Sequence, residues 1–228
     1  MMTKECRRFM KNQRATQTPR QLPSTTPITA QPSKREQILK GAGKVFLAHG
    51  YEGASMSHIA REAGVSKGTL YNHFTSKADL FSAFIMEQSR TKLQAITALV
   101  SNDAQNFKNT LLSVCEAAIH LLLNPEAMSL YRILVAETKK FPNLADIFWK
   151  HSFGANLSHL SQWLQRCHDT ATLTVPDAEF AAEQLMAMCQ TRIINRRRLA
   201  LPVDDSAQAI AQLAELTAES FFKIYAPH

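Results

Sequence analysis

The stretch HIAREAGVSKGTLYNHF, residues 58–74, decides the fold because two short helical patterns meet in it at a glycine. The first pattern follows Ser55 and ends near Ala63, and the second follows Ser66. Gly64 lies between them and can adopt the left-handed backbone that a sharp turn requires. Two short helices joined in this way predict a helix-turn-helix.

A helical projection separates the residues after Ser66 into two faces. Leu70 and Phe74 are four residues apart and therefore point inward together. The outward face is small and polar, with Asn72 at its centre, and consists of Lys67, Gly68, Thr69, Tyr71, Asn72 and His73.

The outward face has the chemistry of a DNA-reading surface. An asparagine amide can bind an adenine edge through two hydrogen bonds, and a threonine methyl can contact a thymine methyl. Gly68 costs up to about 1 kcal/mol in a helix relative to alanine, so helix stability does not explain it. Close approach of this helix to the backbone of a ligand would explain the glycine. Each residue alone is also compatible with packing or an ordinary surface, but together they favour DNA.

The charge distribution agrees with a polyanionic partner for the first third of the chain. The chain has 228 residues and a net charge of +7. Residues 1–32 carry a net +5, residues 33–80 a net +3, and residues 81–228 a net −1. A basic excess confined to one region indicates that this region contacts nucleic acid.

Composition excludes several other classes of protein. The four cysteines are far apart and lack metal-ligand spacing, so they predict reduced core thiols in a cytoplasmic protein, with no metal site and no cofactor. The longest apolar stretch, Leu111–Leu123, is interrupted by Glu116 and His120, so no membrane contact is expected.

The periodicity from Ser33 onward is helical throughout, which predicts an all-α fold of about nine helices. Ser33 and Glu36 have capping-box spacing before the first helix. Further helices are expected over 77–99, from Phe107, from Pro125, over 153–167, from Pro176 to near Leu199, and over 205–225. The polar, proline-rich residues 1–32 predict a disordered basic arm, and the sequence leaves open whether it contacts DNA.

Residues 33–81 closely resemble the DNA-binding domain of TetR/AcrR-family transcriptional regulators. The resemblance rests on FxxxGY at Phe46–Tyr51, on IAxxAGVSxGTLYxHF from Ile59 to Phe74, and on SKxxL from Ser76 to Leu80. It implies a helix-turn-helix DNA-binding domain over 33–80 and a helical effector-binding and dimerisation domain over 81–228. The implied protein is a homodimeric, usually repressing regulator that binds operator DNA and a small molecule.

The resemblance also implies roles for individual residues. Gly68, Thr69 and Asn72 would lie at base edges. The phosphate contacts carried over by position are Ser55, Ser66, Lys67, Tyr71, His73 and Lys77.

The C-terminal part contains two further candidate sites. Tyr131, Phe153 and Trp163 are candidate walls of an effector pocket, although aromatic residues at helical spacing are also typical of a core. The apolar character suggests a hydrophobic effector. A four-helix dimer interface built from the last two helices of each subunit would use Leu185, Met188, Ile193, Ile210, Ala214 and Phe221. The basic run Arg196–Arg198 is interpreted as a solvated helix end.

Two alternative functions follow from the same residues. Ser66, Lys67, His58 and His73 could suggest an enzyme, but no carboxylate orients either histidine and a short exposed helix offers no deep cleft. We therefore expect no catalytic residues. The second alternative is a DNA-binding module without ligand control, which would lack a cavity in its C-terminal domain.

Overall fold

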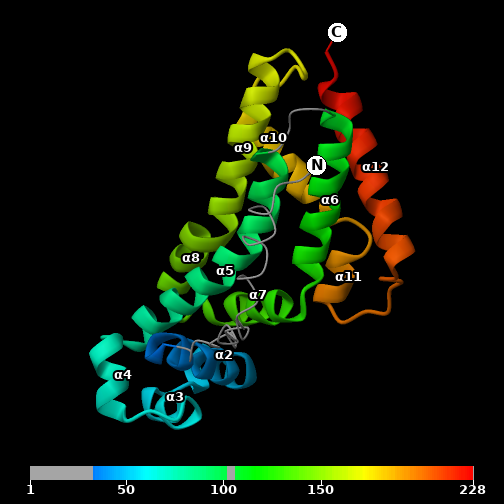
Figure 1. Cartoon of the computed structure of the whole chain (residues 1–228). Coiled ribbons are helices and arrows are strands. Elements are labelled where there is room, and N and C mark those ends of the chain that lie inside the picture. The colour runs from blue at the N-terminus through cyan, green and yellow to red at the C-terminus, as the bar shows by residue number, and fades with distance from the viewer. Residues whose placement is uncertain (1–32, 102–105, 228) are drawn as a thin grey trace, which may run out of the picture. The chain divides into compact units, whose positions relative to one another are not determined.

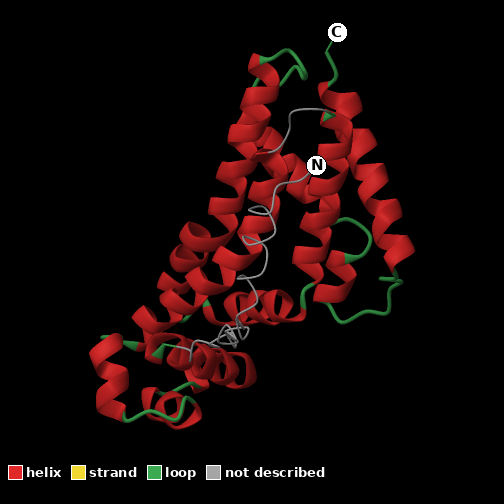
Figure 2. Cartoon of the chain, in the orientation of Figure 1, coloured by secondary structure: helices red, strands yellow, loops and turns green. Residues whose placement is uncertain are grey.

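Helices are the regular elements of the computed structural model, which describes residues 33–101 and 106–227 (Figure 2). Within these ranges the fold is all-α, as the periodicity predicts. The predicted N-terminal arm lies outside the described residues. The elements are α2 Lys34–Gly53, α3 Met56–Glu62, α4 Lys67–His73, α5 Lys77–Ser101, α6 Phe107–Leu123, α7 Pro125–Glu137, α8 Asn143–Phe148, the π-helical η1 Trp149–Phe153, α9 Gly154–Asp169, α10 Ala178–Cys189, α11 Ile194–Arg198 and α12 Ala207–Tyr225.

Serine side chains begin the N-terminal helices as the sequence predicts. The Ser33 hydroxyl accepts from the backbone N–H of Glu36, and the Glu36 carboxylate accepts from the N–H of Ser33. Ser55 and Ser66 cap α3 and α4 in the same position. These caps satisfy backbone donors that have no partner inside a helix, which fixes where each helix begins.

The predicted helix from Pro176 to Leu199 is in fact interrupted. It consists of α10 and the short α11, and between them Arg192 adopts a positive φ of 58°. The sequence contains neither Gly nor Pro at this break, so periodicity alone does not locate it. The structure also adds α8 and η1, which run directly into α9 and were not expected.

Helix α5 runs from the helix-turn-helix into the helical bundle (Figure 1). It contributes side chains to two apolar cores. The N-terminal half of α5 contributes Leu80, Phe81, Phe84 and Ile85 to the core beneath α2, α3 and α4. The same core includes Leu130 and Leu134 of α7 and Leu144 of α8. The second core lies among α6, α9, α10 and α12, and residues of the C-terminal half of α5 pack into it. The helix-turn-helix is therefore packed directly onto the helices that follow it.

Glu137, the last residue of α7, makes the most specific contact between these two parts. Its two carboxylate oxygens accept from the backbone N–H groups of Tyr51 and Glu52, each at 2.8 Å. Gly50 precedes them with φ 71°, and a Cβ at this position would lie 2.5 Å from Glu137 Oε1. Gly50 is thus required both for its backbone conformation and for the approach of the carboxylate.

Three of the cysteines, Cys115, Cys167 and Cys189, are buried free thiols, and Cys6 lies outside the described residues. Among the described side chains, no group of three His, Cys, Asp or Glu could bind a metal ion. No helix in the described part of the chain is long and apolar enough to cross a membrane.

Candidate nucleic-acid interface and ligand cavity

The turn between α3 and α4 is fixed by backbone contacts. Gly64 has φ 63°, and the N–H of Val65 donates to the carbonyl of Ala60 at 3.0 Å. The side-chain amide of Gln37 on α2 donates to the carbonyl of Ala63 at 2.7 Å. These bonds satisfy carbonyls at the end of α3 and set the direction in which α4 leaves the turn.

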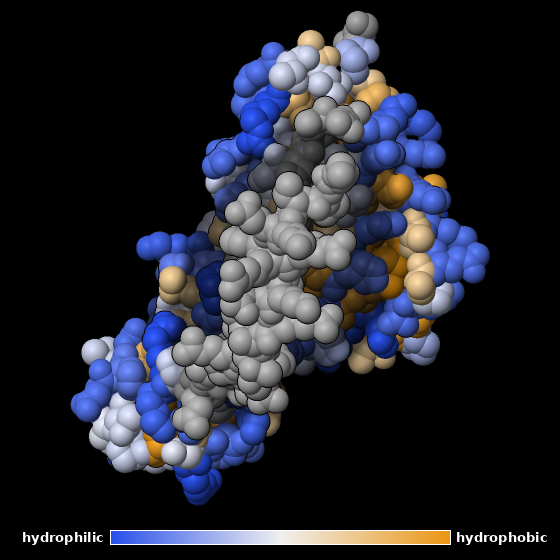
Figure 3. All heavy atoms as spheres, in the orientation of Figure 1, coloured by the Kyte–Doolittle hydropathy of each residue, from blue (hydrophilic) through white to orange (hydrophobic). Residues whose placement is uncertain are grey.

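Helix α4 presents its predicted outward face to solvent. Leu70 and Phe74 are buried in the core, as the projection predicts. Lys67, Gly68, Asn72 and His73 are exposed, and so is Tyr71. Hydrophilic residues cover most of the visible surface of the part that contains α2, α3 and α4, at the lower left of Figure 3. The exposed set is free to contact a macromolecule.

The hydroxyl groups at the start of α4 are committed to the helix itself. Ser66 Oγ accepts from the N–H of Thr69 at 2.9 Å and lies 2.8 Å from Thr69 Oγ1. Thr69 is half-buried. Ser55 makes the equivalent cap at α3, where its Oγ accepts from the N–H of His58 at 3.2 Å. The predicted contacts at these positions would therefore add to an existing structural role.

Lys77, predicted as a phosphate contact, is bound to the end of α2. Its ammonium donates to the carbonyls of Tyr51 at 2.7 Å, Ala54 at 2.9 Å and Glu52 at 3.3 Å, and lies 4.5 Å from the centre of the Tyr51 ring. Desolvation lowers the pKa of Lys77 below its ordinary value, and the carboxylates of Glu137 and Glu52 oppose that shift. An ammonium has three donors, and all three are used here. The geometry gives Lys77 a structural role at the end of α2, and its contact with phosphate stays a prediction.

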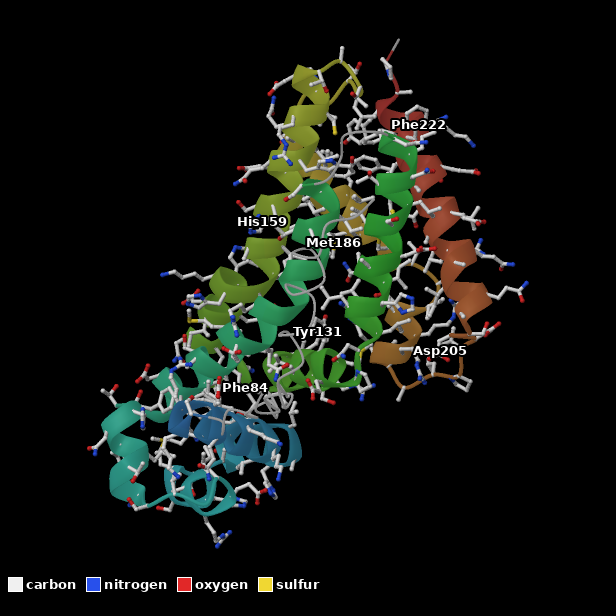
Figure 4. All side chains as sticks on the ribbon, viewed as in Figure 1. Phe84, Tyr131, His159, Met186, Asp205 and Phe222 are labelled. Atoms are coloured by element: carbon white, nitrogen blue, oxygen red, sulfur yellow. The ribbon has the colours of Figure 1, made fainter. Side chains whose placement is uncertain are left out.

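The C-terminal part contains a cavity of about 380 Å³. Its walls come from α5, α6, α7, α8, η1, α9, α10 and α11, and they consist of Gln88, Ser89, Leu121, Leu122, Ala127, Leu130, Tyr131, Phe148, Trp149, Ser152, Phe153, Asn156, Met186, Gln190 and Arg198. Figure 4 labels Tyr131 on α7 and Met186 on α10. A mainly apolar cavity of this size with a few polar groups is typical of a small-molecule site.

Of the three aromatic residues predicted to form a pocket, two line this cavity and one does not. Tyr131 and Phe153 line it. Trp163 does not: it is 1% exposed and stacks on Phe107 with ring centres 5.5 Å apart. Trp163 is absent from the wall of this cavity because its side chain is enclosed by the second core.

Most of the residues predicted for a dimer interface face the interior of their own chain. Leu185, Ile193, Ile210, Ala214 and Phe221 are buried, and Met188 packs against the same core. Apart from the partly buried Met188, these side chains are covered by their own chain, because the strongest apolar stripe of each helix packs on the core. The exposed large apolar side chains of α10 and α12 are instead Phe180, Leu216 and Ile224, at 54%, 47% and 57% exposure.

Arg198 and Asn156 are cavity residues that the sequence interpretation missed. The Arg198 guanidinium lies 4.1 Å from the centre of the Tyr131 ring and donates to Gln190 Oε1 at 2.6 Å, so it is not part of a solvated helix end. Asn156 was detectable in principle. It follows Phe153 by three residues and precedes Leu160 by four, which places a polar residue on the inward face of α9.

Both parts of the chain match sequence profiles of known families. Residues 38–84 match bacterial regulatory proteins of the tetR family. Residues 109–227 match the AefR-like transcriptional repressor, C-terminal domain. The second match alone covers more than half of the chain. The two matches together place a helix-turn-helix and a C-terminal domain of the same class of regulator in one chain.

Curated relatives match mainly through the helix-turn-helix. The transcriptional repressor AcnR of Corynebacterium diphtheriae is 35% identical over 63 residues, which are 28% of this chain and 33% of AcnR. The transcriptional activator FasR of Mycolicibacterium smegmatis is 48% identical over 52 residues, 23% of this chain and 24% of FasR. The chain thus spans about a third or less of the length of these relatives.

Solved structures match over most of the chain. A TetR-family regulator from Mesorhizobium loti MAFF303099 superimposes with a TM-score of 0.77 and 25% identity, covering 85% of this chain and 96% of that one. The flavonoid-responsive regulator FrrA gives a TM-score of 0.73 and 27% identity over 86% of this chain and 98% of FrrA.

A helix-turn-helix on a helical domain with a cavity defines a class of DNA-binding regulators. The sequence profiles identify the family within that class: the chain belongs to the TetR family of DNA-binding transcriptional regulators. Members of this family are regulators, which excludes the enzyme suggested by the serine, lysine and histidine residues near α4.

We predict that Gly68→Ala stabilises the protein but weakens DNA binding. A Cβ at position 68 would meet only Ser66 Oγ, at 3.8 Å, so the fold has room for it. Alanine should raise the free energy of unfolding by up to about 1 kcal/mol through helix propensity. Urea denaturation and an anisotropy titration on selected operator DNA measure the two effects. Unchanged DNA affinity would show that Gly68 does not approach the duplex.

We predict that Lys77→Met lowers the free energy of unfolding by roughly 1–3 kcal/mol, because three carbonyls at the end of α2 lose a charged donor. Lys67→Met is the matched control, since Lys67 is exposed and should change stability little. Urea denaturation compares the two. If Lys77→Met is as stable as the wild type and its DNA affinity depends less steeply on salt, Lys77 contacts phosphate instead.

Proposed function

We propose that this regulator is a homodimeric repressor that a small, largely hydrophobic effector releases from its operator. The observation that carries the proposal is that one chain contains both an exposed polar helix α4 and a mainly apolar cavity, and that α7 contacts both parts. The AefR-like repressor profile over residues 109–227 supports repression. A DNA-binding module without ligand control is disfavoured because the cavity is present.

The proposed DNA contacts lie on the outward face of α4. Gly68, Thr69 and Asn72 would contact base edges, with Asn72 the principal reader of an adenine. Lys67, Tyr71 and His73 are exposed around them and would contact phosphates, together with Ser55 and Ser66 at the starts of α3 and α4.

Dimerisation is proposed because one recognition helix of seven residues reads only a short half-site. Two copies related by a two-fold axis can bind successive major grooves, roughly 34–36 Å apart or a multiple of that distance. We assign the interface to the outward faces of α10 and α12, with Phe180, Leu216 and Ile224 as its apolar side chains. Exposed apolar residues on two adjacent helices are typical of an interaction surface.

Transmission from the cavity to DNA is proposed to run along α7. Ala127, Leu130 and Tyr131 of this helix line the cavity, and Glu137 at its end binds the N–H groups of Tyr51 and Glu52. Helix α5 provides a parallel connection, since Gln88 and Ser89 line the cavity and Phe81 and Phe84 pack under the helix-turn-helix. An effector that displaces either helix would shift the recognition helices, and ligand and DNA would then be reciprocally coupled.

Asn72→Ala tests the recognition face. An operator is first obtained by selecting bound sequences from random duplex DNA. The variant should lose about 1–3 kcal/mol of affinity for that operator and accept other bases at one position of each half-site. Gln165→Ala, an exposed amide on α9, is the matched control. Wild-type affinity and base preference in Asn72→Ala would contradict the proposed docking.

Leu216→Glu tests the dimer interface. A carboxylate buried at the interface would be costly, so this variant should become a monomer in light scattering and bind a two-half-site operator weakly. Val135→Glu is the control, because Val135 is a 64% exposed apolar residue on α7 rather than on α10 or α12. A wild-type protein that is monomeric at micromolar concentration would contradict the dimer itself.

A further inference from the structure

The cavity wall contains one formal charge, and it is positive. Among its lining residues Arg198 is the only cation, and none is Asp or Glu. Four aromatic side chains, Tyr131, Phe148, Trp149 and Phe153, surround the space. An apolar cavity with a single cationic group favours a ligand that combines an aromatic body with a negative charge.

Arg198 is available to such a charge. Within the described residues its guanidinium has no carboxylate within ion-pair distance, whereas its neighbour Arg197 pairs with Asp205 at 2.7 Å. The contacts that Arg198 does make are to neutral groups: the Tyr131 ring and the amide oxygens of Gln190 and Asn195. A guanidinium has five N–H donors, so these contacts leave donors for an anion.

Asn156 supplies the second requirement for the ligand. The residue is 9% exposed, and its Nδ2 donates to the carbonyl of Ser152 at 2.9 Å. That bond fixes which end of the amide is which, because a carbonyl can only accept. Asn156 Oδ1 is buried and has no hydrogen-bond partner in the described part of the chain. A buried acceptor without a donor is unfavourable, and a ligand hydroxyl would satisfy it.

The π-helical turn η1 creates this arrangement. The N–H of Gly154 donates to the carbonyl of Trp149, five residues earlier, and a Cβ at position 154 would lie only 2.9 Å from that oxygen. The turn contributes Trp149, Ser152 and Phe153 to the cavity wall and presents the Ser152 carbonyl to Asn156. Isolated π-helical turns occur frequently at functional sites.

We propose that the ligand is an aromatic carboxylic acid that also bears a hydroxyl group. The carboxylate would bind Arg198 on α11, and the hydroxyl would donate to Asn156 Oδ1 on α9. The two residues belong to different helices, which lie apart in Figure 1, and we place the acidic and hydroxyl groups at different ends of the ligand. This inference rests on the effector function proposed above and specifies its chemistry.

Isothermal titration calorimetry on the full-length protein tests the proposal with three related compounds. They are 4-hydroxycinnamate, cinnamate, which lacks the hydroxyl, and methyl 4-hydroxycinnamate, which lacks the charge. We expect 4-hydroxycinnamate to bind at least about tenfold more tightly than either of the others. Decanoate serves as the aliphatic acid, and tighter binding of decanoate would overturn the aromatic assignment.

Two variants assign the preferences to their residues. Asn156→Leu should abolish the preference for the hydroxylated acid, and Arg198→Gln should abolish the preference for the acid over its ester. Arg196→Gln is the matched control on α11, since Arg196 is exposed and does not line the cavity. The comparison of the three compounds on the wild-type protein needs no variant to fold.

Several results would overturn the inference: no binding of the three compounds, equal binding of all three, or unchanged selectivity in both variants. Because the titration contains no DNA, such a failure leaves operator binding and dimerisation untouched. Conversely, selective ligand binding by a protein that binds no operator would overturn the proposed function while leaving the ligand chemistry in place.

Discussion

The carboxylate of Glu137 makes the contact on which the relation between the two parts of this regulator depends. One side chain at the end of α7 accepts from two consecutive backbone N–H groups, those of Tyr51 and Glu52, immediately after the bend at Gly50. The carbonyls of the same segment accept from Lys77 at the start of α5. Both polar sides of one short backbone segment are thus bound by charged side chains from different helices.

The consequence is a short physical route from cavity to recognition helix. Charge-assisted hydrogen bonds to backbone groups are stronger and more directional than apolar contacts. In the proposed mechanism they would transmit a displacement of α7 to the end of α2, which shares one apolar core with α3 and α4. Lys140, which forms an ion pair with Glu52, and Phe141, whose ring packs on Tyr51, lie just beyond α7 and reinforce the same contact. In our account this segment carries the coupling between effector and operator.

The sequence predicted those features that depend on local rules. Serine caps, the left-handed glycine at position 64 and the inward pair Leu70 and Phe74 follow from neighbours a few residues away, and all are present. The surroundings of other predicted site residues depend on tertiary contacts, which local rules do not reveal. Lys77 donates to carbonyls that are distant in sequence. The apolar side chains Leu185 of α10 and Phe221 of α12 are buried in the core of their own chain.

The cavity was only partly predictable for the same reason. Tyr131 and Phe153 were identified by residue type, and Trp163 has the same character but stacks on Phe107. The groups that give the cavity its chemistry, Asn156 and Arg198, come from helices far apart in sequence. Their juxtaposition follows from the π-helical turn and the break before α11, and the periodicity of the sequence revealed neither.

Transmission of effector binding to the operator through Glu137 is tested most directly by a double-mutant cycle on operator affinity. Ala127→Phe places a phenyl group in the cavity from α7 and so imitates an effector without requiring its identity. Operator dissociation constants are measured for the wild type, Ala127→Phe, Glu137→Ala and the double variant. We predict that filling the cavity weakens operator binding in the wild-type background by roughly 1–3 kcal/mol and by much less when Glu137 is absent. Equal weakening in both backgrounds would contradict transmission through Glu137.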